Sequence, residues 1–409
     1  MPSPTLLTAD VHDPWSMRQA GAQWLSLALM DARNRTLGWL AALEGADTQL
    51  ALPGAESPLW WIGQVAWFQE RWIGRNLQCQ RGAAADPNGP QLASIEPNAD
   101  RWFAPGSTRR ARRRNEAPLF RKSLRDYLAA TLEATLELLE KADDGDDTLY
   151  AFRTALLHED RVSETLASMA RSMEAVPKDA LWSLPTWPNR RRLDPLGFGA
   201  QTVVLGSAGG GFAPDNERPC SPIEVPEFEI DAQPVCWAQY AEFASDGGYD
   251  EAQWWSPQGW AWLQASQRRS PRYVEQMGHG VLLSLRGQMQ RAPAQQSALH
   301  VSWYEADAFC RWAGRRLPTE PEWAAAIAVA GGRGFAWGDG FEWMAGSARA
   351  RPGQVDGPAR LDAWPGEGDW RLLRGASLAT VPRQRHPGAR RLGLASRDDL
   401  FCCFRSCAL

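Results

Sequence analysis

The stretch 149–173, LYAFRTALLHEDRVSETLASMARSM, decides the fold of the first half of this chain. Its apolar residues recur at intervals of three, four and seven positions, and this spacing predicts an amphipathic helix with one apolar face. His158 lies on or near that face. Because residues four apart share a helix face, a second metal ligand would be expected at position 162, where the chain has valine. One histidine cannot hold a metal alone, so a core histidine with local hydrogen-bond partners is the alternative that these residues leave open.

Three earlier segments, 15–44, 58–77 and 119–142, also carry helical spacing. The second begins with a proline, which suits the first turn of a helix, and places Gln64 among four aromatic residues. A buried amide must be hydrogen-bonded, so Gln64 belongs either to a polar core network or to the edge of a site. Four helices with apolar stripes predict a bundle whose interior can hold a site.

Between residues 82 and 118 the helical spacing disappears and proline and glycine accumulate, which predicts a long loop. It contains the basic run RRARRR at 109–114. Such a run is either a solvated basic segment or a binding site for an anionic or carboxylate group. Nucleic acid is disfavoured as a partner, because no aromatic interleaving accompanies the arginines.

In the second half of the chain, helical spacing gives way to short segments with the spacing of strands. Residues 177–200 are rich in proline, tryptophan and arginine and are interpreted as a linker between a first domain, 1–176, and a second, 201–409. TVVLG at 202–206 and IEVPEFEID at 223–231 alternate with period two and predict strands, whereas 237–246 and 304–314 predict short helices. Strands, short helices and many loops indicate an irregular α+β domain.

Composition narrows the classes of function. The net charge of -4 gives no general attraction to nucleic acid or membrane, and no apolar run is long enough to cross a bilayer. The N-terminus lacks the pattern of a signal peptide, so a cytoplasmic protein with reduced thiols is expected. Buried structural cysteines are the preferred interpretation of Cys402, Cys403 and Cys407, with reactive thiols as the alternative. Twenty-two tryptophans suggest aromatic cores or a cavity for a flat or cationic ligand.

Four ordered segments of the second half resemble the formylglycine-generating-enzyme-like, or sulfatase-modifying-factor, domain. They are HVSWYEADAFCRWAGRRLPTEPEWAAA at 300–326, WGDGFEWM at 337–344, LRGASLAT at 373–380 and FCCFRSCA at 401–408. The resemblance implies a C-type-lectin-like α+β scaffold that carries substrate-binding loops.

In the first half, PLWWIGQVAWFQERWI and ALLHEDRVSETLA resemble the metal-binding segments of the DinB-like four-helix domain of the ergothioneine-type sulfoxide synthases. SIEPNADRW and YLAATLEATLELL are similar to phrases of the selenoneine synthase branch of that family. The resemblance implies a non-heme iron(II) enzyme that uses O2 to join a donor to the imidazole carbon of trimethylhistidine. The donor would be a thiol or, in the selenoneine branch, a selenosugar.

The three iron-ligand positions of the family fall on Gln64, His158 and Val162. A facial triad needs three donors, and valine has none. Glu159 and Asp160 are candidates for a compensating carboxylate, although they point about 100° and 200° away from His158 on a helix.

The resemblance also implies substrate residues: Arg113 as a contact to the donor, and Asp339, Glu342 and Trp343 as the lining of an acceptor pocket. A quaternary ammonium group would suit cation–π contact with tryptophan. Two functions follow from this pattern. One is iron-dependent formation of a C–Se or C–S bond, as in selenoneine or ergothioneine biosynthesis. The other is a catalytically inactive or regulatory homologue that keeps a small-molecule cleft. An enzyme that uses a cysteine without metal is a third possibility.

Overall fold

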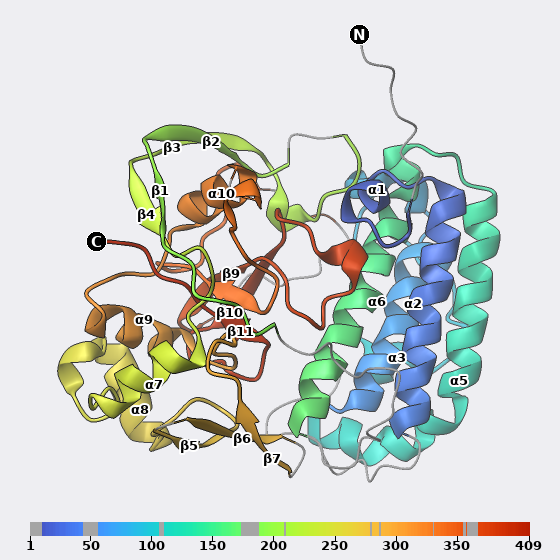
Figure 1. Ribbon diagram of the computed structural model, residues 1–409. Coiled ribbons are helices and arrows are strands. Elements are labelled where there is room, and N and C mark those ends of the chain that lie inside the picture. The colour runs from blue at the N-terminus through green and yellow to red at the C-terminus, as the bar shows by residue number, and fades with distance from the viewer. Residues whose placement is uncertain are drawn as a thin grey trace.

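The computed structural model describes residues 10–43, 56–105, 110–172, 188–207, 210–278, 280–285, 288–329, 331–354, 357 and 367–409, without the side chains of 110–122 and 172. Two parts stand side by side in Figure 1. The N-terminal part is helical, as predicted, and the second part combines short strands with short helices. None of the described helices is both long and apolar enough to cross a membrane.

Four long helices build the N-terminal helical part, namely α2, α3, α5 and α6, which pack against one another around one apolar core. The described elements of this part are α1 (Pro14–Arg18), α2 (Ala22–Leu43), α3 (Pro58–Gln69), the π-helical turn η1 (Glu70–Gly74), the 3-10 turn η2 (Cys79–Ala84), α4 (Ala99–Phe103), α5 (Arg110–Glu140) and α6 (Asp146–Ser172). Ser57 begins α3 by accepting a hydrogen bond from the Trp60 N–H at 3.1 Å, with proline in the first turn.

Two predicted boundaries were wrong. The segment 15–44 forms two helices, because the side chain of Asp144, from the turn between α5 and α6, accepts the backbone N–H of Ala22 at 2.8 Å and starts α2 there. The predicted loop 82–118 contains α4 and the first two turns of α5, so residues 110–114 of the arginine run are helical. Arginine and alanine favour helix, and here they outweigh Pro118.

The described residues of the second part form four small sheets. A four-stranded sheet has the order β10-β9-β8-β11, with β11 parallel to β8 and the other pairs antiparallel. Its strands are β8 (Phe341–Trp343), β9 (Trp370–Arg374), β10 (Arg390–Leu394) and β11 (Cys402–Cys403). The other sheets pair β1 (Leu196–Phe198) with β4 (Phe228–Ile230), β2 (Gln201–Leu205) with β3 (Ser221–Val225), and β5 (Val274–Met277) with β6 (Val281–Leu285) and β7 (Gln288–Ala292).

The predicted strands and short helices of this part are confirmed, except that 223–231 is divided between β3 and β4. The helices are α7 (Trp237–Ser245), α8 (Pro257–Ser266), α9 (Trp303–Trp312) and α10 (Glu320–Val329), with 3-10 turns η3 (Asp215–Glu217), η4 (Ala252–Trp254), η5 (Gly331–Arg333) and η6 (Pro382–Gln384). Neither α8 nor α10 was expected. Both are ten-residue helices with weakly segregated apolar residues, so periodicity alone does not reveal them.

The segment 375–389, which connects β9 to β10 and is called the docking loop below, holds the two parts together. Arg383 of this loop binds Asp160 of α6 through two hydrogen bonds of 2.8 and 2.7 Å. Glu164, one turn further along α6, accepts hydrogen bonds from Ser377 and Thr380. One face of α6 is therefore the surface on which the second part docks.

Candidate functional site

His158 lies in the middle of α6 with its imidazole buried in the helical part. The ring stacks on Phe68 of α3, with centroids 4.0 Å apart and an interplanar angle of 7°. Burial, and secondarily the positive charge of Arg161, lowers the pKa of His158 to about 3. Its Nδ1 is buried and has no hydrogen-bond partner in the described part of the chain. His158 is therefore a neutral imidazole at physiological pH, with one ring nitrogen uncommitted.

Gln64 lies one turn before Phe68 on α3, and its side chain is also buried. Its Oε1 has no hydrogen-bond partner among the described residues. Val162, one turn after His158 on α6, belongs to the apolar core. The three ligand positions of the resembled family thus supply one imidazole, one amide and one hydrocarbon.

The carboxylates next to His158 are engaged elsewhere. Glu159 accepts hydrogen bonds from Arg33 at 2.9 Å and from Thr36 at 2.7 Å, both of α2. Asp160 faces the docking loop and is bound by Arg383. The ion pairs disfavour the alternative in which one of these two carboxylates replaces a missing ligand, because neither can turn toward His158 without breaking a buried ion pair.

Iron does not fit the donor set around His158. No group of three or more His, Cys, Asp or Glu side chains that could hold a metal ion exists among the residues that the structure describes. His158 and the amide oxygen of Gln64 offer at most two donors, and an open non-heme iron site uses three protein ligands. Arg33 adds a buried positive charge in the same region, where it binds Glu159 and also contacts Gln69 of α3.

Asp339 lies where the second part approaches the helical part. Its carboxylate accepts a hydrogen bond from the Ser297 hydroxyl at 2.7 Å and forms an ion pair with Arg190. Its backbone carbonyl accepts the N–H of Leu378 in the docking loop, at 3.4 Å. Asp339 is therefore next to the loop that contacts α6, which agrees with a position near an interdomain site, while its predicted substrate role stays a prediction.

Glu342 and Trp343 lie elsewhere, in the core of the second part. Glu342 is fully buried, binds Arg405 at 2.7 Å and accepts the indole N–H of Trp323 at 2.9 Å. Trp343 is also fully buried and donates its N–H to the Val301 carbonyl at 2.8 Å. Both side chains therefore contribute to core packing among the described residues. Their predicted role in an acceptor pocket stays a prediction.

The remaining predicted residues divide into two groups. The side chain of Arg113 lies outside the described residues. Cys402, Cys403 and Cys407 are free thiols in the core of the second part, and burial raises the pKa of each, that of Cys407 to about 12. A thiol that is protonated and inaccessible is a poor nucleophile, which supports the structural interpretation of this cluster.

Two arginines of the site were missed. Arg33 and Arg383 are buried and hold Glu159 and Asp160 in place. The sequence indicates that Arg33 is buried, because it lies on the apolar stripe of its helix, one turn after Leu29. No sequence pattern indicates the role of Arg383, because its partners are more than 200 positions away in the sequence.

Comparison with known proteins agrees with the two-part architecture. Residues 199–394 match the model of the sulfatase-modifying factor enzyme 1-like domain. The chain is 29% identical to the hercynine oxygenase of Mycolicibacterium smegmatis, over 90% of this chain and 95% of that protein. It is 29% identical to the hercynine oxygenase of Mycobacterium tuberculosis, over 92% and 96% of the two chains. The formylglycine-generating enzyme of Streptomyces coelicolor is 30% identical over 34% of this chain and 49% of its own length.

The similarity to hercynine oxygenases covers both parts of the chain. It agrees with the resemblance to the ergothioneine-type sulfoxide synthases that the sequence motifs indicate. The narrower assignment to the selenoneine branch stays a prediction.

Proposed function

We propose that this chain binds the substrate class of the ergothioneine-type sulfoxide synthases, a trimethylated histidine together with a thiol or selenosugar donor, without iron-dependent oxygenation. The substrate class is supported by the similarity to hercynine oxygenases over nine-tenths of the chain. The loss of oxygenation is supported by one observation: a single imidazole, His158, stands where the family places three ligands.

The number of metal donors, and not the protonation state of His158, argues against iron binding. With a pKa of about 3, His158 is neutral at pH 7 and its ring nitrogen could donate to a metal. Val162 supplies no donor, and an amide oxygen such as that of Gln64 is a weak ligand for iron(II). Glu159, the carboxylate next to His158, is already ion-paired with Arg33 and is not available as a further ligand.

The second candidate function is iron-dependent, O2-dependent formation of a C–Se or C–S bond on the imidazole of trimethylhistidine. Two buried polar atoms favour it, Gln64 Oε1 and His158 Nδ1, because neither has a hydrogen-bond partner in the described part. Buried polar atoms without partners are uncommon in folded proteins and point to an absent group. In this candidate both atoms would be iron donors and the third donor would come from a bound substrate.

Metal analysis separates the two candidates. The full chain is incubated with iron(II) under anaerobic conditions, desalted, and analysed for bound iron beside a His158→Ala variant. We expect the same background iron in both proteins. One iron per chain in the wild type, lost in the His158→Ala variant, would overturn the proposal in favour of the oxygenase. As a positive control, Gln64→His combined with Val162→His should gain iron, because it restores three imidazoles.

Ligand binding tests the other half of the proposal. Titration calorimetry with trimethylhistidine, in the presence of a chelator, should show saturable binding to the wild type. Asp339→Asn should weaken it, whereas Asp250→Asn, at an exposed ion pair with Arg269, should leave it unchanged. Absence of binding in iron-free protein would overturn the proposed binding function.

A further inference from the structure

A groove of about 840 Å³ lies between α7 and the three-stranded sheet β5-β6-β7 of the second part. One wall is a face of α7, and the other is formed by residues of β6 and β7 and by the two residues that follow β7. Figure 1 shows α7 beside this sheet. The volume falls in the range of roughly 300–1,000 Å³ that is usual for small-molecule sites. The groove is therefore large enough for a ligand of its own.

Two tryptophans give the groove an aromatic surface. Trp237 is the first residue of α7 and is only 3% exposed, and Trp312 is the last residue of α9. Trp312 packs edge-on against Phe243, with ring centroids 5.7 Å apart. The indole N–H of Trp237 donates to no acceptor in the described part of the chain. A buried indole N–H usually has an acceptor, so the one that lines this groove indicates an acceptor on a ligand.

Charged side chains of both signs line the groove without pairing. Glu242 of α7 and Asp246, which caps the C-terminus of α7, lie one turn apart on the helical wall. Arg291 of β7 lines the other wall. No ion pair joins Arg291 to either carboxylate, and none of these three side chains has another charged partner among the described residues. The two signs of charge are thus held apart across the groove.

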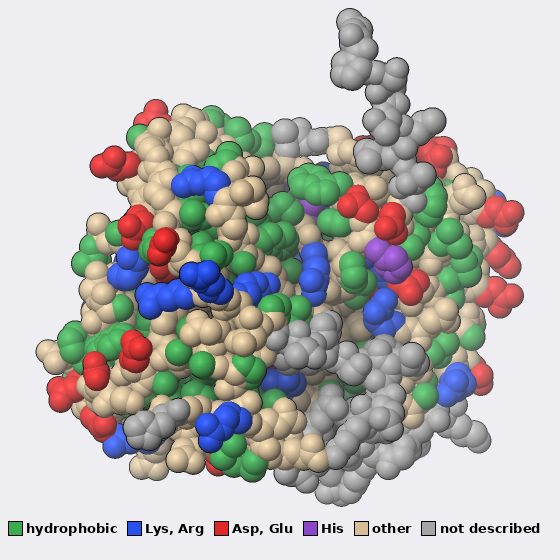
Figure 2. All heavy atoms as spheres, in the orientation of Figure 1, with side chains coloured by type: hydrophobic (Ala, Val, Ile, Leu, Met, Phe, Trp, Pro, Cys, Tyr) green, Lys and Arg blue, Asp and Glu red, His purple; other side chains and the backbone are tan. Residues whose placement is uncertain are grey.

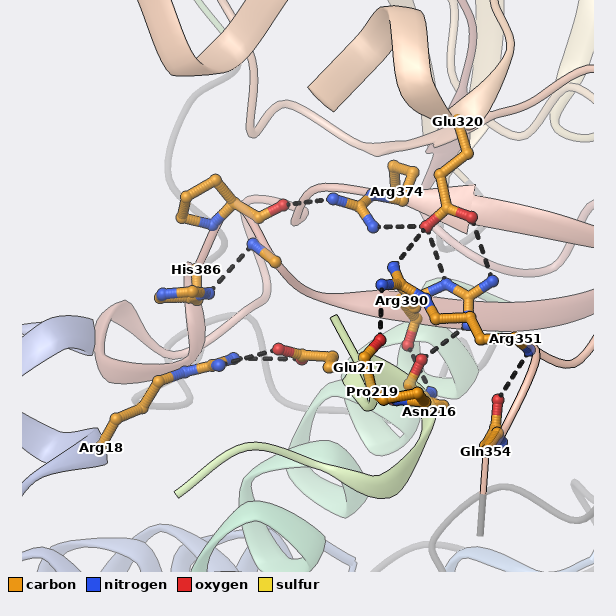
Figure 3. A network of polar contacts seen from close by, with 12 residues as sticks. Arg18, Asn216, Glu217, Pro219, Glu320, Arg351, Gln354, Arg374, His386 and Arg390 are labelled. Atoms are coloured by element: carbon orange, nitrogen blue, oxygen red, sulfur yellow. Dashed lines mark hydrogen bonds and ion pairs between the residues drawn. The ribbon is translucent and has the colours of Figure 1, made fainter. Parts of the chain in front are cut away.

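Elsewhere in the second part, opposite charges bind each other directly. Glu320 accepts hydrogen bonds from Arg351 at 3.0 Å, Arg374 at 2.7 Å and Arg390 at 3.0 Å (Figure 3). Such a cluster leaves no charged group for a ligand. Figure 2 shows acidic and basic side chains at the corner of the molecule where Figure 1 labels α7, α8 and β5. Charges at a surface can be solvated by water, so it is their position around a groove with an unpartnered indole that indicates a site.

The walls of the groove define the chemistry of a ligand. Glu242 and Asp246 attract a cation, and the C-terminal end of α7 adds the negative end of a helix dipole to them. The planar guanidinium of Arg291 suits a carboxylate, which it can bind through two parallel hydrogen bonds. The indoles between them suit a flat apolar body. A ligand that meets all three conditions carries an ammonium and a carboxylate at opposite ends of an apolar or aromatic body.

We propose that this groove binds a short apolar peptide with free ends, with its ammonium group at Glu242 and Asp246 and its carboxylate at Arg291. A free amino acid carries both charges on one carbon atom, whereas each further residue of an extended peptide separates them by about 3.3–3.6 Å. The site is additional to the proposed trimethylhistidine site, because neither Asp339 nor any residue of the helical part or the docking loop lines the groove.

The dipeptide alanyl-phenylalanine is the first probe. It is titrated into the full chain by calorimetry at constant ionic strength, beside its N-acetyl derivative, which lacks the ammonium, and its C-terminal amide, which lacks the carboxylate. We expect saturable binding of the dipeptide and affinities at least about tenfold lower for each derivative, because each loses one charge-assisted contact. Equal affinity of the dipeptide and both derivatives, or of free phenylalanine, would overturn the proposal.

Two variants assign each end of the peptide to its wall. Arg291→Gln should weaken binding of the dipeptide about tenfold and leave the affinity of the C-terminal amide unchanged, since the amide has no carboxylate to lose. Glu242→Gln combined with Asp246→Asn should weaken the dipeptide and leave the N-acetyl derivative unchanged. Arg269→Gln, at an exposed ion pair with Asp250, is the matched control and should bind like the wild type.

A folding defect has a different signature from loss of a charged contact. It would weaken the dipeptide and both derivatives by the same factor, and that outcome in the Arg291→Gln variant would refute the assignment. Competition separates the groove from the proposed trimethylhistidine site. The affinity for alanyl-phenylalanine should be the same with and without an excess of trimethylhistidine. Displacement of one ligand by the other would place the peptide at that site and overturn the inference.

Discussion

Arg383→Met should lower the free energy of unfolding by about 3–5 kcal/mol, the usual cost of removing one partner from a buried ion pair. The Arg383 side chain is 0% exposed and its partner Asp160 is 1% exposed. Two hydrogen bonds of 2.8 and 2.7 Å join them, and only Gln384, at 2.9 Å, would still donate to Asp160. The second partner of Arg383, Asp31, is 37% exposed, so water replaces that contact at little cost.

The assay is urea unfolding of the full chain, followed by tryptophan fluorescence. Asp160→Asn combined with Arg383→Met should recover most of the loss, because an amide leaves no buried charge behind. Arg311→Met, at an exposed pair on α9, should stay within about 0.5 kcal/mol of the wild type. If Arg383→Met costs less than about 1 kcal/mol, or if the double variant is as unstable as the single one, the docking loop is not held by this ion pair.

Three further predictions concern other buried groups. Glu342→Gln should lower the free energy of unfolding by about 3–5 kcal/mol, because it leaves the fully buried Arg405 without its counter-charge. His158 has a folded-state pKa of about 3 against about 6.5 when unfolded, so on acidification the unfolded chain takes up this proton first. The free energy of unfolding should therefore fall below pH 6.5, by about 2 kcal/mol at pH 5, and His158→Gln should remove this contribution. Gly63→Ala should cost about 1–3 kcal/mol, because the new Cβ would lie 2.1 Å from the Phe103 ring.

Each of the three has a matched control or a contrary outcome. Loss of trimethylhistidine binding in Glu342→Gln without any loss of stability would support the predicted substrate role of this residue. His12→Gln, at an exposed histidine, should keep the acid dependence of the wild type, and parallel pH profiles for the wild type and His158→Gln would contradict the assigned pKa. Gly74→Ala meets its nearest side-chain atom at 4.0 Å, so a cost equal to that of Gly63→Ala would rule out the contact with Phe103.

The helices could be predicted from the sequence because one face of each must be apolar. The periodicity of 149–173 gave α6 to within a few residues. Where a helix begins is a different question, because a cap can come from any part of the chain. The start of α2 depends on Asp144, which lies 122 positions away, and no local pattern reveals such a cap.

The site could be predicted only in part, because many of its contacts join residues that are far apart in the sequence. His158 could be placed in the interior from its helix face alone. A family motif does not separate a residue that contacts substrate from one that supports the core, and Glu342 proves to bind Arg405, 63 positions later in the sequence. The sequence also did not predict that Glu320 of α10 binds three arginines. These are Arg351, Arg374 of β9 and Arg390 of β10, which lie far apart in the sequence.

The periodicity of α6 explains how the residues on its interior face can change while the architecture remains. His158 and Val162 are four residues apart and face the interior of the helical part. Asp160 and Glu164 are also four apart, but they are offset from the first pair by two residues, or about 200°. They face the docking loop, and their hydrogen bonds to it do not involve position 162. A substitution on the interior face therefore leaves the docking contacts of the other face intact, so similarity over the whole chain shows a shared fold and does not by itself establish the chemistry of the interior face.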